Sequence, residues 1–301
     1  MKITIIGLGL IGGSMARDLR KARFGSDFTG VETNETHANE ALELGLVDRI
    51  EPLEKAIMNT DLIIIAIPVD KTLEVLPFVL DRIKENTTVT DMGSTKKEIT
   101  ARVKDHPRKK QYVPAHPMSG TENSGPKAAL DGLFKNKISI ICDHKETGPQ
   151  HLALIEKMFQ ALGMDIAYMT SDEQDHSTAF VSHLPHAAAF ALANAVLAKE
   201  DRKIIFDLAS GGFRSTVRLA KSSDSMWRPV FEQNSHYVVE SMDVYIEHLQ
   251  RFRDCIKNRQ FKKLGELIVR ANRIRGILDG KNPHLIKNEE KIVKLYTKSD
   301  E

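Results

Sequence analysis

Small and polar residues follow four apolar segments of the sequence, at the positions where buried strands would end. They are Gly7, Pro68, Ser94 and His116. Because the carboxyl ends of parallel strands meet at one edge of a sheet, where such folds bind ligands, we expect these residues to line one crevice. A histidine in an arbitrary loop is usually structural or solvated, so its position is what makes His116 a candidate for chemistry. Ser94 also starts a predicted helix, where serine is a common N-cap, and the two roles do not exclude each other.

The first of these positions opens a glycine pattern, Gly7-x-Gly9-x-x-Gly12, which stands between a predicted strand and a predicted helix. Gly7 allows the tight turn, Gly9 lets a pyrophosphate approach the backbone, and Gly12 lets helix and strand pack closely. The free amides at the start of the helix, at Leu10 and Ile11, then hold the anion. A bare glycine triplet is a weak signal. In this setting it predicts a dinucleotide site rather than a turn without a ligand.

An acidic residue, Glu32, follows the second predicted strand about 20 residues after the glycines, where such folds bind the adenosine ribose. Its carboxylate would accept hydrogen bonds from the ribose hydroxyls and repel a 2′-phosphate, which favours NAD over NADP. The alternative is a solvated loop carboxylate. Pro68 cannot continue a central strand, so the chain leaves the sheet there, at the edge predicted to bind the cofactor.

Short apolar runs alternate with helical segments through the first part of the chain. This pattern predicts an α/β Rossmann-like dinucleotide-binding domain over residues 1–170. The predicted strands are 2–6, 28–32, 61–68, 87–91, 111–115, 137–142 and 165–169, and the helices between them include 14–20, 35–44, 71–83 and 149–162.

After residue 169 only helical periods remain, which predicts an all-α helical (dimerisation) domain over 171–280 and a charged tail over 281–301. The run 187–197 is apolar nearly all round, as in a helix at the centre of a bundle or a dimer. This run predicts a homodimer that forms through the helical domain.

The first helix of this domain is predicted over 172–199, started by a capping box at Ser171-x-x-Gln174. Pro185 removes one backbone donor inside that helix, so we expect a kink near His183. Two further amphipathic helices are predicted over 235–257 and 261–278.

Three basic residues, Arg214, Arg218 and Lys221, are spaced by four and three, which predicts one face of a helix. For Arg214 and Lys221 a solvated basic surface is the better explanation. Trp227 and Phe231 also share a helix face, and core packing explains them better than a platform for a ligand.

Composition excludes several classes of protein. The chain has 301 residues, of which 41% are hydrophobic and 28% charged, with a net charge of +2 and no basic stripe interleaved with aromatics, so nucleic acid is not an expected partner. Cys142 and Cys255 form no metal or redox spacing, and no metal is predicted. No apolar run reaches the ~20 residues of a membrane span. The glycine pattern begins too early for a signal peptide, so we expect a cytoplasmic protein.

Five motifs in order resemble those of the prephenate dehydrogenases, over about residues 1–280. They are GLGLIGGS at Gly7–Ser14, DMGSTK at Asp91–Lys96, HPMSGTENSG at His116–Gly125, SHLPHAAAFAL at Ser182–Leu192, and Arg218 with Met226-Trp227-Arg228. The resemblance implies an NAD(P)-dependent enzyme that leads to tyrosine, with a Rossmann-like domain followed by a helical domain that forms the dimer.

The resemblance also implies the reaction, which is oxidative decarboxylation of prephenate to 4-hydroxyphenylpyruvate. His116 matches the catalytic histidine of the family, which takes the proton of the ring hydroxyl as hydride leaves for the nicotinamide. An ordinary imidazole pKa near ~6.5 suits that task. Ser94 matches a serine that orients the same hydroxyl. Loss of carbon dioxide makes the ring aromatic, so no metal is required.

Substrate-binding residues follow from the same resemblance. Arg218 matches an arginine that binds a substrate carboxylate, for which a planar guanidinium is suited. His186 matches a histidine that meets the substrate from the helical domain, and His183 is the competing choice. Glu122 lies where an acid of the family can gate the pocket.

Several alternatives stay open. Arogenate, the amino analogue, could be the substrate, and tyrosine could bind at the active site. Family members often carry an added regulatory domain, and we expect none here, since the segment after Gly280 is too short for a core of its own. A 3-hydroxyacid dehydrogenase of the 6-phosphogluconate type would place a catalytic lysine in the helix over 172–199, which has a lysine only at its far end. A non-catalytic NAD-sensing protein would need none of His116, Ser94 and Arg218.

Overall fold

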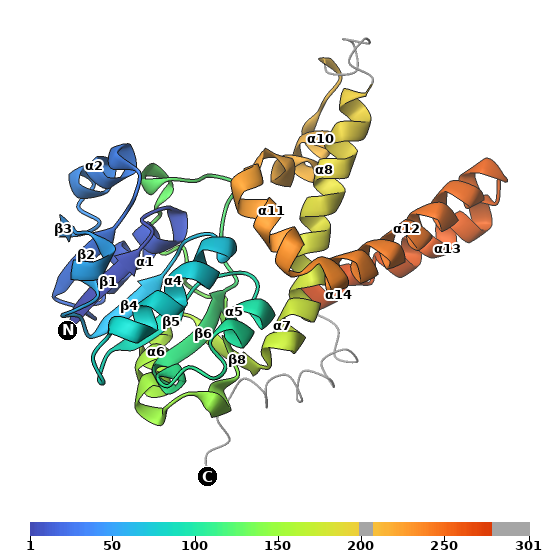
Figure 1. Ribbon diagram of the computed structural model, residues 1–301. Coiled ribbons are helices and arrows are strands. Elements are labelled where there is room, and N and C mark those ends of the chain that lie inside the picture. Colours follow the sequence, from blue (N-terminus) through green and yellow to red (C-terminus); the bar gives the residue numbers. More distant parts are fainter. Residues whose placement is uncertain (199–206, 279–301) are drawn as a thin grey trace. The chain divides into compact units, whose positions relative to one another are not determined.

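A computed structural model describes residues 1–198 and 207–278 (Figure 1). The contacts within the chain divide it into two compact units, Met1–Ser235 and the part that starts at His236. The first unit contains the whole sheet and every residue that the sequence pointed to for chemistry. The tail predicted over 281–301 lies outside the described residues.

An eight-stranded sheet forms the centre of the first unit, in the order β3-β2-β1-β4-β5-β6-β7-β8. Neighbouring strands are parallel except for β6 and β7, which are antiparallel. This confirms the predicted Rossmann-like fold with a parallel sheet. The strands are β1 Lys2–Ile6, β2 Asp27–Val31, β3 Arg49–Ile50, β4 Leu62–Ile65, β5 Thr88–Asp91, β6 Tyr112–Pro117, β7 Ile138–Cys142 and β8 Asp165–Met169.

Helices cover both faces of this sheet, and alternate residues of the central strands face opposite layers. Ile64 packs into one hydrophobic cluster with α1 and α6, whereas Ile63 and Ile65 pack into a second cluster with α4 and α5. This is why the strands are apolar throughout rather than alternating. The helices of this part are α1 Leu10–Lys21, α2 Glu35–Glu43, α3 Leu53–Ala56, α4 Val69–Arg82, α5 Lys97–Arg102 and α6 Pro149–Ala161.

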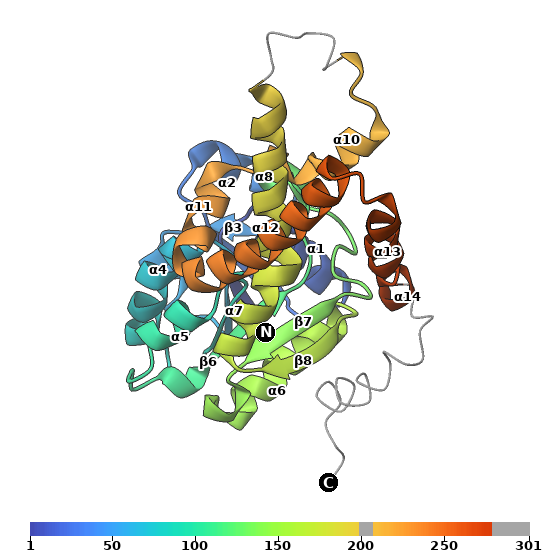
Figure 2. The same ribbon diagram turned by 90° about the vertical axis from the view of Figure 1, so that its right-hand side faces the viewer.

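The predicted long helix after β8 is divided in three. α7 covers Ser171–Thr178, a π-helical turn covers Ala179–His183, and α8 covers Leu184–Leu197. The π turn ends at His183, two residues before Pro185, which has no N–H to continue the ladder. The capping box also differs from the prediction by one residue, because Thr170 and Glu173 form it. Figure 2 shows α7 and α8 following one another.

The remaining helices within residues 1–198 and 207–278 are amphipathic or short. Those of the first unit are α10 Gly211–Thr216, a 3₁₀ turn Arg218–Lys221 and α11 Asp224–Gln233. α12 Ser235–Lys257 begins at the division, and α13 Phe261–Ala271 and α14 Ile274–Leu278 follow it in the second unit. The predicted helix over 261–278 is therefore two helices.

One helical stretch, Ser171–Leu197, is long and apolar enough to cross a membrane by length and composition alone. The expectation that no apolar segment reaches that length is therefore wrong. Only 11% of its most apolar window is buried within the chain. Its first part is nevertheless packed into the protein, since Gln174, Asp175 and Thr178 of α7 are buried. A stretch that is buried by its own chain at one end and apolar and exposed at the other fits a surface that a second chain covers.

Candidate active site

The glycine loop after β1 is held so closely that two of its positions exclude a side chain. Gly7 has a φ of +89°, and a Cβ on it would lie 2.6 Å from the carbonyl oxygen of Ala66, just after β4. A Cβ on Gly12 would lie 2.0 Å from the carbonyl oxygen of Gly7. The first contact joins the loop to the end of β4, from which Pro68 leads into α4. The ends of two central strands therefore meet at the predicted cofactor edge.

The start of α1 has the features of an anion site. Gly9 is its N-cap, no side chain of the described residues caps it, and no acidic residue lies in its first turn. Leu10 and Ile11 are its first residues. Because the first turn carries no acidic side chain, the positive end of the helix dipole is not neutralised from within that turn. Apart from Gly9 and the residues on either side of it, the only described atom within 4 Å of a Cβ placed on Gly9 would be the amide nitrogen of Gly125. This open, uncapped helix start fits the pyrophosphate of a dinucleotide.

Glu32, one residue after β2, holds the backbone beside the glycine loop. Its Oε2 accepts from the N–H of Leu8 at 3.3 Å, and its Oε1 accepts from the N–H of Asn34 at 3.0 Å. Asn34 in turn caps α2 by accepting from the N–H of His37 at 2.9 Å. The carboxylate is therefore held between the glycine loop and α2, at the position where folds of this kind bind a ribose.

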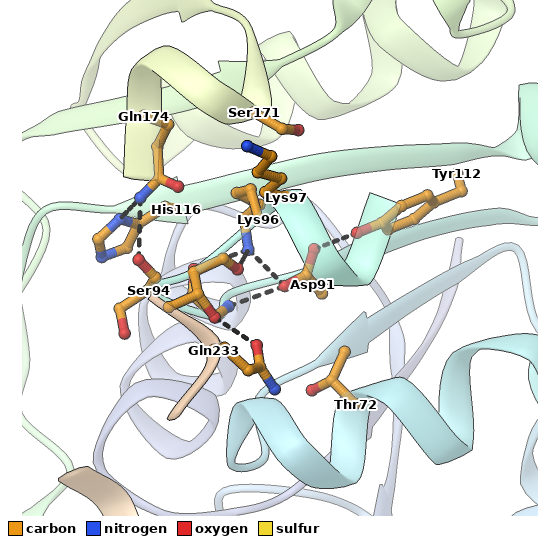
Figure 3. A network of polar contacts seen from close by, with 12 residues as sticks. Thr72, Asp91, Ser94, Lys96, Lys97, Tyr112, His116, Ser171, Gln174 and Gln233 are labelled. Carbon is orange, nitrogen blue, oxygen red and sulfur yellow. Dashed lines mark hydrogen bonds and ion pairs between the residues drawn. The ribbon is translucent and has the colours of Figure 1, made fainter. Parts of the chain in front are cut away.

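A buried ion pair shapes the loop that carries Ser94 (Figure 3). Lys96 Nζ donates to Asp91 Oδ2 at 2.5 Å and to the carbonyl of Gly93 at 2.7 Å, and both charged side chains are fully buried. The other carboxylate oxygen of Asp91 accepts from the hydroxyl of Tyr112 at 2.6 Å. These hydrogen bonds tie the end of β5 to the turn that follows it, and the backbone of Ser94 is fixed as a result.

The helix after this loop is capped by another element, so Ser94 is not its N-cap as the sequence suggested. α5 begins at Lys97, and Asp175 of α7 accepts from the N–H groups of Lys96 at 2.7 Å and Lys97 at 3.0 Å. Burial raises the pKa of Asp175 to about 6, although both hydrogen bonds act to lower it. Because the carboxylate of Asp175 caps α5, the hydroxyl of Ser94 has no capping role.

His116 lies inside a strand, so the predicted strand end at residue 115 is two residues too early. β6 extends to Pro117, and His116 pairs with Ile140 of the antiparallel β7. The residue is 8% exposed. Burial holds the pKa of its imidazole well below the usual value, with a further lowering by the charge of Lys96 and by His183. His116 is therefore a neutral ring at the edge of the sheet.

Gln174 of α7 joins the two predicted catalytic residues, although its place in the sequence suggested only a capping role. Its Nε2 donates to the carbonyl of Ser94 at 2.9 Å and lies 3.1 Å from Nδ1 of His116 (Figure 3). Both residues are far from Gln174 in the sequence. No spacing marks such a contact, and the amide could be found only once α7 was placed against β5 and β6.

The two candidate histidines of the helical segment both contact Trp227. The ring of His186 stacks on the indole, with 3.5 Å between centroids, and its Nδ1 lies 2.9 Å from the carbonyl of Ser182. His183 meets the indole edge-on and is fully buried, with Nδ1 3.0 Å from Nδ2 of Asn234. Burial, with His186 nearby, lowers the pKa of His183 to about 4. Burial also lowers the pKa of His186, which keeps part of its surface open.

Arg218 forms an ion pair with Glu122, which is also a predicted substrate-binding residue. Its Nη1 lies 2.6 Å from Oε2 of Glu122, and the two side chains are 51% and 23% exposed. A hydrogen bond from its own backbone, followed by the bond from Arg218, lowers the pKa of Glu122. Arg214 does not share a helix face with Arg218, because α10 ends before the 3₁₀ turn that carries Arg218 and Lys221.

Among the described residues, no group of three or more histidine, cysteine or acidic side chains is arranged to hold a metal ion. The site consists of a glycine loop with an open helix start, a fixed acid beside it, and a neutral histidine next to a serine. Nearby are an arginine and two histidines on an indole. This set on a doubly wound sheet defines a nucleotide-dependent dehydrogenase of the Rossmann type.

Two family models match the chain. The prephenate dehydrogenase nucleotide-binding domain matches residues 15–168, and the prephenate dehydrogenase dimerization domain matches residues 170–270. The prephenate dehydrogenase of Bacillus subtilis is 31% identical over 88% of this chain and 73% of its own length. The cyclohexadienyl dehydrogenase of Zymomonas mobilis is 30% identical over 85% of this chain and 89% of its own length.

Solved structures agree with this match. Prephenate dehydrogenase of Aquifex aeolicus, in complex with hydroxyphenyl propionate and NAD⁺, superimposes with a TM-score of 0.84 at 29% identity, over 92% of this chain and 98% of that one. Arogenate dehydrogenase of Synechocystis superimposes with a TM-score of 0.72 at 28% identity, over 92% of this chain and all of that one. The chain belongs to the prephenate dehydrogenase family and is an NAD-dependent oxidoreductase.

Proposed function

We propose that this protein catalyses the NAD-dependent oxidative decarboxylation of prephenate to 4-hydroxyphenylpyruvate, a step toward tyrosine. The observation that carries the proposal is the pairing of a buried neutral histidine, His116, with Ser94 through Gln174, at the sheet edge that also holds the glycine loop. A neutral base and a hydroxyl at that edge suit the oxidation of a ring alcohol.

The chemistry divides between the cofactor and the chain. Bound NAD⁺ supplies the acceptor for the hydride that leaves the ring carbon bearing the hydroxyl. Ser94 orients that hydroxyl, and His116 takes its proton as the carbonyl forms. The bond from the ring to the carboxylate then breaks, its electron pair enters the ring, and carbon dioxide leaves. His116 returns the proton to the phenolate oxygen, so the net reaction releases no proton.

Arg218 supplies the cation for a substrate carboxylate. Burying a carboxylate without a cation is costly, and a guanidinium offers two parallel donors to it. Arg218 Nη1 donates to Oε2 of Glu122 at 2.6 Å. An incoming carboxylate would take the place of Glu122, which suits an acid at the entrance of the pocket. His186 and His183 are the candidates to contact the rest of the substrate from the helical segment.

Arogenate is the second candidate substrate. The names of two relatives support arogenate as a candidate substrate, since one relative is a cyclohexadienyl dehydrogenase and the other an arogenate dehydrogenase. The two substrates differ only in a keto or an amino group on the side chain, so one polar contact could decide between them. The alternative of a 3-hydroxyacid dehydrogenase with a catalytic lysine loses support, because Ser171–Leu197 contains no lysine.

The deciding experiment incubates the purified protein with NAD⁺ and either prephenate or arogenate and follows NADH absorbance near 340 nm. We expect turnover with prephenate and a lower kcat/KM with arogenate. A reversed ratio would assign the enzyme to arogenate. No turnover with either compound, together with measurable NAD⁺ binding, would favour a non-catalytic NAD-sensing protein.

A further inference from the structure

The connection between β6 and β7 runs along α1, the helix whose start is expected to bind the cofactor pyrophosphate. Two of its backbone N–H groups donate to side chains of that helix. The N–H of Leu130 donates to Ser14 Oγ at 2.9 Å, and the N–H of Gly132 donates to Asp18 Oδ1 at 2.9 Å. Ser14 and Asp18 are four residues apart, so this part of the connection follows one side of α1. We call residues 125–132 the strap.

Close packing holds the strap against the start of α1. A Cβ on Gly13 would lie only 2.9 Å from the Cβ of Ala129, so strap and helix touch where the sequence has no side chain. Lys127 Nζ also lies 2.7 Å from Oε1 of Glu40 in α2. Lys127 is exposed, so this ion pair contributes little, and the packing against α1 is the stronger restraint. The strap therefore has a defined place beside the glycine loop.

Gly125, the first residue of the strap, has a backbone conformation that only glycine adopts readily, with φ +82° and ψ 173°. Its amide nitrogen would lie 3.9 Å from a Cβ on Gly9. At Gly9 the glycine pattern lets a pyrophosphate approach the backbone. The N–H of Gly125 donates to no acceptor among the described residues. A backbone donor without a partner thus lies beside the expected position of a phosphate.

We propose that the N–H of Gly125 donates a hydrogen bond to the pyrophosphate of NAD. The cofactor is then held from two directions, by the N–H groups at the start of α1 and by the strap. Hydrogen bonds to charged oxygens are stronger than those to neutral acceptors, so one donor at this place has a measurable effect on affinity. The proposal concerns the cofactor site and does not depend on which substrate the enzyme oxidises.

A purely structural reason for a glycine at this position predicts a different behaviour. Gly125 precedes the 3₁₀ turn Pro126–Ala128, and the need to turn the chain there would by itself explain the positive φ. In that case the N–H of Gly125 stays in contact with solvent whether or not the cofactor binds. Protection of this one N–H by the cofactor separates the two explanations.

The first test is amide NMR of the deuterated wild-type protein with assigned backbone resonances. We expect the amide proton of Gly125 to move downfield and to exchange more slowly with solvent on saturation with NAD⁺. ADP-ribose, which has the same pyrophosphate without the nicotinamide, should have the same effect. Gly132, whose N–H is already bonded to Asp18, is the internal control and should change in neither respect. If the signal of Gly9 reaches saturation while Gly125 keeps its shift and its exchange rate, the proposal is wrong.

The second test is the Kd for NAD⁺, measured by isothermal titration calorimetry without turnover. Gly125→Ala should displace the amide, because a side chain is strained at this φ. We expect the Kd to rise by about tenfold to a hundredfold, the equivalent of one hydrogen bond to a charged group. Gly132→Ala is the matched control, since Gly132 also has a positive φ, +69°, within the strap.

Equal Kd values for Gly125→Ala and Gly132→Ala would overturn the proposal. If Gly125→Ala does not fold, the first test still decides, because it uses the wild type. A protein that shows the Gly125 contact but oxidises neither prephenate nor arogenate would reject the proposed function and leave this contact in place.

Discussion

The pKa values of the residues in this site depend on burial as much as on the residue types. The sequence predicted His116 from its place near a strand end, with an ordinary pKa. Within β6, burial and the charge of Lys96 lower that pKa. His116 therefore stays neutral below pH ~6.5, and kcat/KM should fall only as the pH approaches the lowered value.

The general base is tested by His116→Asn, which keeps a hydrogen-bonding side chain but cannot take a proton. We expect kcat to fall by roughly 10²–10⁴, the usual contribution of a general base, with the Kd for NAD⁺ nearly unchanged. Steady-state kinetics and a binding titration measure the two quantities. A variant that keeps over half of the wild-type kcat would remove His116 from the mechanism.

Glu32 should set the choice of cofactor. Glu32→Gln keeps one acceptor oxygen for the N–H of Leu8 or Asn34 but removes the negative charge that repels a 2′-phosphate. We expect a higher KM for NAD⁺ and a smaller ratio between the KM values for NADP⁺ and NAD⁺. If both KM values stay as in the wild type, Glu32 does not meet the ribose.

Arg218 should set the affinity for prephenate. Arg218 is half exposed, so Arg218→Ala should raise the KM for prephenate by about tenfold to a hundredfold, less than the loss of a fully desolvated partner. Arg218→Lys should restore only part of the affinity, since an ammonium cannot make the two-pronged contact. Arg214→Ala is the control and should change little. A raised KM for NAD⁺ with an unchanged KM for prephenate would assign Arg218 to the other ligand.

At the scale of elements, most of the sheet and its helices could be predicted, because apolar runs and glycine turns are local signals. The predicted strand 165–169 and helix 235–257 match β8 and α12. Two of the misses are contacts between distant elements. Asp175 caps α5 in place of Ser94, and Gln174 reaches His116. Neither contact leaves a periodic trace in the sequence, since each depends on how α7 packs against the sheet.

The turn between β5 and α5 shows how one buried pair supports the site. Breaking a buried ion pair leaves a charge without a partner, which costs about 3–5 kcal/mol. Lys96→Met should therefore lower the free energy of unfolding by that amount and displace Ser94. Lys97→Met is the neighbouring control, because Lys97 is 59% exposed in its pair with Asp172 and should change stability by less than about 1 kcal/mol.

Urea unfolding measures both variants, with stability taken from the midpoint at an unchanged slope. A midpoint for Lys96→Met within error of that for Lys97→Met would show that the turn does not depend on the buried pair.

At the scale of the whole molecule, α8 is an apolar helix that a single chain leaves largely uncovered. Within the described part of the chain, Ala189 is the only buried residue of this helix, although α8 is predominantly apolar. Phe190 of this helix also lines an open pocket of about 720 Å³ with Trp227 and Phe231 of α11. The family model over residues 170–270 is that of a dimerization domain. A second copy of the chain that covers this surface would explain why a helix so apolar is exposed.

We therefore expect a dimer of twice 33.8 kDa in sedimentation velocity at micromolar concentration. In a two-fold interface each substitution occurs twice, so a charge on α8 should be doubly unfavourable. Leu192→Glu, at a position 37% exposed in the single chain, should raise the dissociation constant of the dimer by about a hundredfold or more, since a buried carboxylate without a cation is costly. Met58→Glu is the control, because Met58 is 62% exposed and lies in the nucleotide-binding part. A stable wild-type monomer, or equal dissociation constants for the two variants, would show that α8 does not form the interface.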